Sequence, residues 1–352
     1  MRLPSIDVKL RANRDPHIFI LGAGASRAAT PHGDRAGRTL PLMADLAETI
    51  GLAGPLDSAD VKWRGLDFET LYQDLWKSDT HKGLVGKLDL YIRRYFERLE
   101  IPERPTVYDY ILLGLREKDL IATFNWDPLL AQAYQRNSQI TRLPQIVFLH
   151  GNVAVGICVN CRVKGYYGDV CAKCSRALER TQLLFPIADK DYTSDPFISA
   201  EWAVLKDFLE RAYMLTIFGY RAPSSDVAAV ELMRTAWGAN GARELALVEI
   251  VDIRSENDVL PSWKPFITGN RYGIVDSVFN TWSCLYPRRS CDSFAWATLQ
   301  QQPWSENRIP STFDKLDDLQ SWVSPLLDEE RAQEEKDTAF SGARSRGHRD
   351  HP

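Results

Sequence analysis

"HIFILGAGASRAA", residues 17–29, is the stretch that decides the fold class. An apolar run leads into a turn with two glycines and then into residues suited to a helix. This order is typical of the strand–turn–helix unit of a parallel α/β sheet. Glycines at such a turn let a pyrophosphate approach the backbone, and the helix start offers free N–H groups. Packing alone would also explain two glycines there, so both interpretations stay open.

Four later segments repeat the pattern of an apolar strand between helical stretches. They are residues 119–127, 145–151, 213–220 and 245–253. Strands that are apolar throughout and alternate with helices predict a Rossmann-like, mostly parallel sheet covered on both faces. Apolar residues every three or four positions within 66–117 predict a helical insertion in this α/β domain.

Composition bounds the class of protein. The 352 residues are 44% hydrophobic and 26% charged, with a formal net charge of -4, which argues against a general nucleic-acid-binding surface. No apolar run approaches the roughly 18 residues that a membrane span needs. The first 17 residues are charged and lack an apolar signal-peptide core, so we expect no membrane association and a cytoplasmic location.

Two CxxC pairs predict a metal site. Cys158 and Cys161 are followed, after nine residues, by Cys171 and Cys174. Two such pairs supply four thiolates in a tetrahedron, the closed arrangement of structural zinc sites. We therefore predict a small zinc-ribbon module over 152–180 with structural Zn²⁺. The alternative is two unrelated pairs of buried or redox cysteines.

Polar residues follow the predicted strands. His150 ends one strand, and because four sulfurs complete the shell of zinc, it is left for chemistry or for ordinary packing. Asn125 and Asp127 end another strand and alternate, so they point the same way in an extended chain. Asp127 can cap the helix that begins at Pro128, a role that does not account for Asn125.

Two further strand ends carry candidate ligand-binding residues. Gly219 is followed by Ser224 and Asp226, of which Asp226 can be a simple helix cap. Asp252 ends the last predicted strand, where an acid can accept a hydrogen bond from a ribose hydroxyl or simply lie at the surface.

Taken in this order, the pieces resemble the SIR2 (sirtuin) family over residues 17–258. The similarity rests on GAGAS (22–26), TFNWD (123–127), His150-Gly151, the paired CxxC, Gly219 with its serines and the strand ending at Asp252. It implies an NAD site between the Rossmann-like domain and the zinc module. It also implies that Gly22, Ala23, Gly24 and Ser26 cradle the phosphates, with Gly219, Ser224 and Asp252 on the cofactor and Asp127 at the nicotinamide end. Asn125 and His150 would be catalytic, with His150 as the general base.

One departure bears on the reaction. Where protein-deacylating sirtuins clamp the acyl-lysine peptide with a strand, this chain has "LLFPIADKDY" (183–192), and Pro186 lacks the N–H that main-chain pairing needs. "LPLMADL", "DFETLY", "FNWD", "LLFPIADK" and "GYRAPSSD" are instead similar to SIR2-like proteins of prokaryotic antiphage defence, which are mostly NAD-depleting hydrolases.

The resemblance therefore implies an NAD⁺ hydrolase, with NAD⁺ as substrate, that releases nicotinamide and ADP-ribose. A homo-oligomer or a partner ATPase of the HerA type is the implied assembly. The alternatives are an NAD-dependent protein deacylase or ADP-ribosyltransferase, and a non-catalytic module that senses NAD or a derived nucleotide. Domain boundaries are predicted at 1–16 for an N-terminal extension, 17–325 for the NAD-binding domain and 326–352 for a charged, disordered tail.

Overall fold

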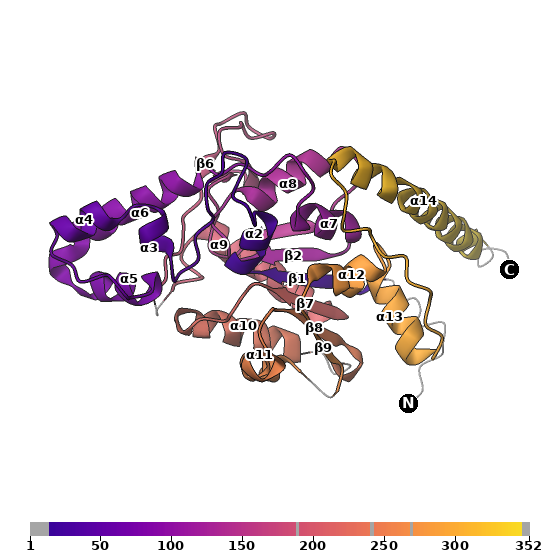
Figure 1. Cartoon of the computed structure of the whole chain (residues 1–352). Helices are drawn as coiled ribbons and strands as arrows, with labels where there is room; N and C mark the ends of the chain where they lie inside the picture. Colours follow the sequence, from indigo (N-terminus) through magenta and orange to yellow (C-terminus); the bar gives the residue numbers. More distant parts are fainter. Residues whose placement is uncertain (1–13, 188–189, 240–242, 268–269, 347–352) are drawn as a thin grey trace.

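The computed structural model describes residues 14–187, 190–239, 243–267 and 270–346. Its centre is a six-stranded sheet in the order β3-β2-β1-β7-β8-β9 (Figure 1), and every neighbouring pair is parallel. The strands are β1 (His17–Leu21), β2 (Leu120–Thr123), β3 (Gln145–Phe148), β7 (Met214–Phe218), β8 (Leu247–Val251) and β9 (Tyr272–Val275). The predicted Rossmann-like α/β class is confirmed.

The order of the strands places the site. From β1 the chain adds strands outward to β3, and it then returns to pair β7 with the other side of β1. The strand order reverses between β1 and β7, and ligands of open parallel sheets collect at this switch point, beyond the carboxyl ends of the strands. All residues of β1, β2, β7 and β8 are buried, which is why these strands read as continuous apolar runs.

Helices cover both faces of the sheet. In Figure 1, α2 (Ala23–Ala29), α7 (Val107–Gly114) and α8 (Leu129–Asn137) lie above the sheet. Beside the lower strands, to the left of β8 and β9 in this view, lie α10 (Val227–Gly238), which packs against α9 (Pro196–Arg211), and α11 (Glu256–Trp263). No helix among the described residues is long and apolar enough to cross a bilayer.

A group of helices protrudes at the left of Figure 1. It contains α3 (Leu46–Thr49), α4 (Ala53–Ser58), α5 (Phe68–Lys77) and α6 (Lys82–Phe96). In contrast, α7 packs on α2 and α8 and covers the sheet. The boundaries 66–117 of the helical insertion therefore stay a prediction. The last helix in this range, α7, covers the sheet and does not lie with the protruding helices.

The C-terminal part contains α12 (Trp282–Leu285), α13 (Ser290–Leu299) and α14 (Leu316–Arg346). The long α14 continues past 326, where a disordered tail was expected. Leu319, Val323 and Leu327 are buried one turn apart along it. Glu330 forms ion pairs with Arg288 and Arg116. Residues 326–330 therefore belong to the packed fold, while residues 347–352 and most of the predicted extension at 1–16 lie outside the described residues.

Candidate functional site

Two glycine turns lock together at the switch point. Gly22 donates its N–H to the oxygen of Phe218, and Gly24 donates to the oxygen of Gly219, both at 3.0 Å. A Cβ on Gly22 would lie 2.5 Å from the Gly219 oxygen, and Gly219 has a positive φ of 67°. Backbone packing therefore requires these glycines, and the N–H of Gly24 is already used within the protein.

Asn125 is anchored to the first turn. Its Nδ2 donates to the oxygen of Gly22 at 2.9 Å and to Oγ of Ser26 at 2.8 Å. A side-chain amide has two donor protons on nitrogen, so these contacts use both and fix which way the amide points. The carbonyl Oδ1 is the end of Asn125 that is left for a ligand.

Ser26 holds Asn125 through a completed set of hydrogen bonds. Its Oγ donates to Oδ2 of Asp127 at 2.7 Å and accepts from Asn125 and from the hydroxyl of Tyr108. A serine hydroxyl has one donor and two acceptor positions, so none remains. The only hydroxyl proton of Ser26 is donated to Asp127, and the side chain is fully buried. In this structure Ser26 therefore has no free donor for a phosphate.

Asp127 makes a capping contact and one contact that the sequence did not predict, while its role at the nicotinamide end stays a prediction. Its Oδ1 accepts from the N–H of Leu129 at 3.1 Å, a capping contact at the start of α8. Its Oδ2 accepts from Ser26, which ties this helix start to the turn after β1. Burial raises the pKa of Asp127 to about 6.

His150 is a buried, neutral histidine with an unused nitrogen. Its side chain is 7% exposed, and Nε2 has no hydrogen-bond partner among the described residues. The ring contacts Phe124 edge-on at 4.8 Å and stacks on Tyr192 at 6.0 Å, measured between centroids. Burial lowers the pKa of His150 to about 4, so the imidazole is unprotonated at neutral pH and can accept a proton.

Three residues beside His150 were not predicted as a group. Lys190 donates to Oδ1 of Asp226 at 2.6 Å, and Tyr220 donates its hydroxyl to Oδ2 at 2.9 Å. His150 Nε2 lies 3.8 Å from Oδ1 of Asp226. Asp226 precedes α10 but makes no capping hydrogen bond there, so the cap that the sequence suggested is not what the carboxylate does.

Asn125 and His150 lie at the same edge of the sheet, in two adjoining clusters. Phe124, next to Asn125, stacks on Tyr220 at 4.1 Å and contacts the ring of His150. Asn152 donates to the backbone oxygen of Asn125 at 3.2 Å. Within the described part of the chain no hydrogen bond joins Asn125 to His150 directly. That they serve one pocket stays a prediction.

The remaining predicted cofactor residues lie further along this edge. Ala23 is the first residue of α2. Ser224 begins the short 3-10 turn η2 (Ser224–Asp226), but its side chain lies outside the described atoms. Asp252 follows β8, accepts hydrogen bonds from the Arg254 guanidinium, the closest at 2.7 Å, and lines an open pocket of about 400 Å³.

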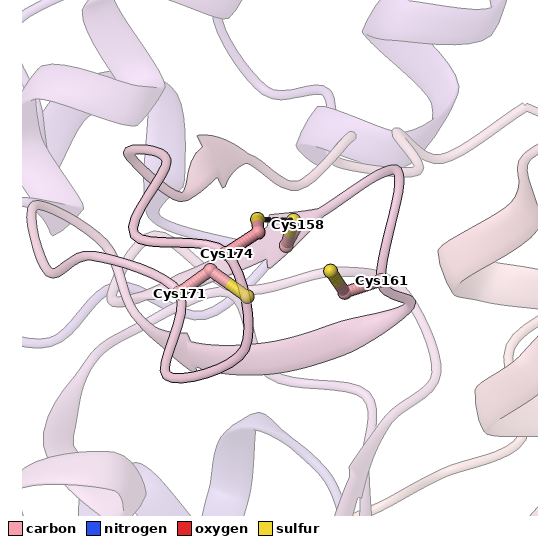
Figure 2. Close-up of side chains that lie close together, drawn as sticks. All are labelled: Cys158, Cys161, Cys171 and Cys174. Carbon is pink, nitrogen blue, oxygen red and sulfur yellow. Dashed lines mark hydrogen bonds between the residues drawn. The ribbon is translucent and has the colours of Figure 1, made fainter.

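The four predicted metal ligands form one cluster. They are carried by a three-stranded antiparallel sheet of β4 (Val155–Cys158), β5 (Val163–Tyr166) and β6 (Glu179–Arg180) and the loops beside it. Figure 2 shows the side chains of Cys158, Cys161, Cys171 and Cys174 gathered together, and their sulfurs all lie within 4.8 Å of one another. Zinc–sulfur bonds of about 2.3 Å in a tetrahedron put sulfurs about 3.8 Å apart. This cluster could hold zinc, and His150 is not part of it.

The backbone around the cluster repeats the same turn twice. Arg162 donates its N–H to the oxygen of Cys158, and Ser175 donates to the oxygen of Cys171, both at 2.8 Å. Arg162 and Ser175 each have a positive φ, near 50° and 58°. Two equivalent knuckles facing each other fit a shared ion and exclude the alternative of two unrelated cysteine pairs.

Comparison with known proteins finds similarity in structure alone. No protein-family model and no curated protein matches the chain. Among solved structures, one from a study of sirtuin substrate affinity is 15% identical and covers 80% of this chain and 97% of its own, with a TM-score of 0.40. A Sir2 bound to acetylated peptide is 14% identical over 85% and 98%, with a TM-score of 0.35.

A Sir2 homologue in complex with NAD is 13% identical over 85% of this chain and 95% of its own, with a TM-score of 0.34. The matching structures are thus of the family that the sequence motifs resemble. At these identities the likeness concerns the fold and assigns no ligand or reaction.

Proposed function

We propose that this chain is an NAD⁺ hydrolase that cleaves the bond between nicotinamide and ribose. The observation that carries the proposal is His150, a neutral buried imidazole with an unpartnered nitrogen at the edge of the sheet where nucleotides bind. A buried polar atom left without a partner costs about 1–3 kcal/mol, so Nε2 points to a partner that it gains only in another state of the protein.

The chain's own residues supply the parts that this reaction needs. As the glycosidic bond breaks, its electron pair goes to the nicotinamide nitrogen and the ribose gains oxocarbenium character. Water then bonds to the ribose carbon, and its proton must leave. Asn125 can orient the water or a ribose hydroxyl through Oδ1, and His150 can take the proton. A positioned base of this kind contributes typically about 10²–10⁴-fold.

The segment after the zinc module favours water, and not an acyl-lysine peptide, as the group that accepts the ADP-ribose. Residues 181–187 contain no strand, and the N–H of Leu184 is donated to the oxygen of His150 at 3.0 Å. Pro186 has no N–H to offer. An extended peptide pairs through exposed main-chain groups, and this segment has few to give.

The biological setting is a further part of the proposal. The resemblance to SIR2-like defence proteins supports an antiphage effector that depletes NAD⁺ after a trigger. Uncontrolled NAD⁺ cleavage would kill the cell, so we propose control by self-association or by a partner such as a HerA-type ATPase.

Nicotinamide release from purified protein tests the proposal. The protein is incubated with NAD⁺ alone, then with an acyl-lysine peptide added, and products are separated by chromatography. We expect nicotinamide and ADP-ribose in equal amounts without peptide. Release that requires the peptide would favour a deacylase, and NAD binding by calorimetry without any product would favour a sensing module.

A further inference from the structure

The Asp226 carboxylate is the centre of a buried group of polar side chains. Asp226, Lys190 and His150 are each exposed by 7% or less at the side chain. Asp226 uses Oδ2 to accept from Tyr220 and Oδ1 to accept from Lys190. A buried carboxylate needs this degree of pairing, because an uncompensated charge in the interior is strongly destabilising.

His150 and Lys190 compete for one oxygen atom. Lys190 Nζ lies 2.6 Å from Oδ1 of Asp226, and His150 Nε2 lies 3.8 Å from the same atom. The latter distance is too long for a hydrogen bond, and Nε2 is buried without another partner. A movement of about 1 Å would bring it within reach once the oxygen was released.

We propose that Lys190 is a latch that withholds Asp226 from His150, and that its withdrawal creates an Asp226–His150 pair. Asp226 and Lys190 are then positioning residues that act through His150. In the latched state the imidazole is neutral and has only a distant carboxylate. In the released state Asp226 accepts a hydrogen bond from Nε2–H, which orients the ring and leaves Nδ1 with the lone pair that takes a proton.

The charges around His150 would give its imidazole a different basicity in the latched state and in the released state. Among the described residues, the charged or titratable groups that face the His150 ring are Asp226, Lys190 and Tyr192, with Tyr220 behind Asp226. Burial is the main cause that lowers the pKa of His150; Asp226 opposes it, and the positive charge of Lys190 adds to it. Removing the ammonium and forming the carboxylate contact both favour the imidazolium. The consequence for activity rests on the proposed NAD⁺ hydrolysis, but the pairing itself does not.

Lys190→Met and Lys190→Gln test the latch by histidine NMR, without any substrate. Signals of labelled imidazoles are followed from about pH 4.5 to 8, and His150 is assigned as the signal missing in His150→Gln. In the wild type we expect no titration of His150 above pH 5. In either Lys190 variant we expect its pKa to rise above about 6, a gain in proton affinity of about a hundredfold. In Lys190→Met/Asp226→Asn the pKa should stay low.

A His150 pKa that stays near about 4 in a folded Lys190 variant overturns the latch, as does an equal rise in the double variant. If both single variants unfold while the double variant folds, His150 cannot replace Lys190 beside Asp226, and the proposal also fails. Activity is measured separately. Under the proposed function, Lys190→Met turns over NAD⁺ faster than wild type at pH 7. A confirmed rise in pKa without any NAD⁺ cleavage would keep the latch and remove the hydrolase.

Discussion

Two buried histidines of this chain differ in how fully the fold uses their ring nitrogens. His17, at the start of β1, uses both ring nitrogens: Nδ1 pairs with Ser290 at 2.9 Å and Nε2 with Thr216 at 2.7 Å. His150, beyond the end of β3, leaves Nε2 unpaired. Burial lowers both pKa values, to about 3 for His17 and about 4 for His150. The fold accounts for His17 completely and leaves part of His150 unexplained.

Alanine at each histidine should therefore have opposite effects. His150→Ala removes the proposed base, and we expect nicotinamide release to fall at least about 100-fold with little change in stability. His17→Ala removes the hydrogen bonds from the ring to Ser290 and Thr216, of which Thr216 keeps only its contact with Glu249. We expect the unfolding free energy to fall by about 2–4 kcal/mol. Denaturant unfolding and nicotinamide release are measured on both variants. Full turnover by a folded His150→Ala would remove the mechanism.

The β1–α2 and β7–α10 turns act as one element. Gly22 and Gly24 pack on Gly219 so closely that no Cβ fits between the two backbones. Asn125 is held by the same turn, because its side-chain amide donates a hydrogen bond to the oxygen of Gly22. The turn thus sets the position of the Asn125 amide, which we propose to be catalytic. Its geometry follows from backbone packing.

Gly219→Ala tests this element against a matched glycine elsewhere. A Cβ at Gly219 would lie 2.1 Å from the N of Ala25, in a backbone conformation that disfavours L side chains. We expect the unfolding free energy to fall by more than about 2 kcal/mol. Gly86, exposed within α6, has nothing near its Cβ position, so Gly86→Ala should stabilise by up to about 1 kcal/mol. Equal melting temperatures for the two variants would contradict the account.

The zinc module is the second element that supports the site. Lys164 of β5 pairs with Glu201 of α9 at 2.8 Å, and Thr181 donates to the oxygen of Asn152 at 2.9 Å, two residues after His150. These contacts join the module to the strand end that carries the imidazole. Zinc bound by the four cysteines would therefore support His150 by holding this module in place.

We expect one zinc per chain in purified protein, measured by mass spectrometry of the metal. Cys161→Ser removes one of four ligands, and it should lower zinc content and melting temperature together. Cys284, buried in α12 away from the cluster, is the control, and Cys284→Ala should retain the metal. Full zinc occupancy in Cys161→Ser would show that the four sulfurs are not a joint site.

At the scale of the whole molecule, the pattern of apolar residues predicted which segments are buried. It did not predict contacts between segments that lie far apart in the sequence. The strands of the sheet centre could be predicted because all their residues are buried. Edge strand β9 could not, since it is only partly buried and carries a glycine. Leu319, Val323 and Leu327 hold α14 in place beyond 326, although the charged residues around them suggested disorder.

The residues of the candidate site also fall into those that the sequence could predict and those that it could not. The four cysteines could be predicted because zinc ligands of this kind come in CxxC pairs that are visible in the sequence. Lys190 and Asp226 are 36 residues apart in a segment and a turn without periodicity, and only the folded chain brings them together. Asn125 and His150 were proposed as site residues because they follow strands, whose carboxyl ends meet at one edge of a parallel sheet. That role stays a prediction.

The measurement that tests the central claim most directly is nicotinamide release from NAD⁺ by the wild type and by Asn125→Ala, at equal concentration of folded protein. The account predicts nicotinamide and ADP-ribose from the wild type and, because the anchored amide is gone, at least about a hundredfold less from the variant. An inert wild type, or a variant as fast as the wild type, would contradict it.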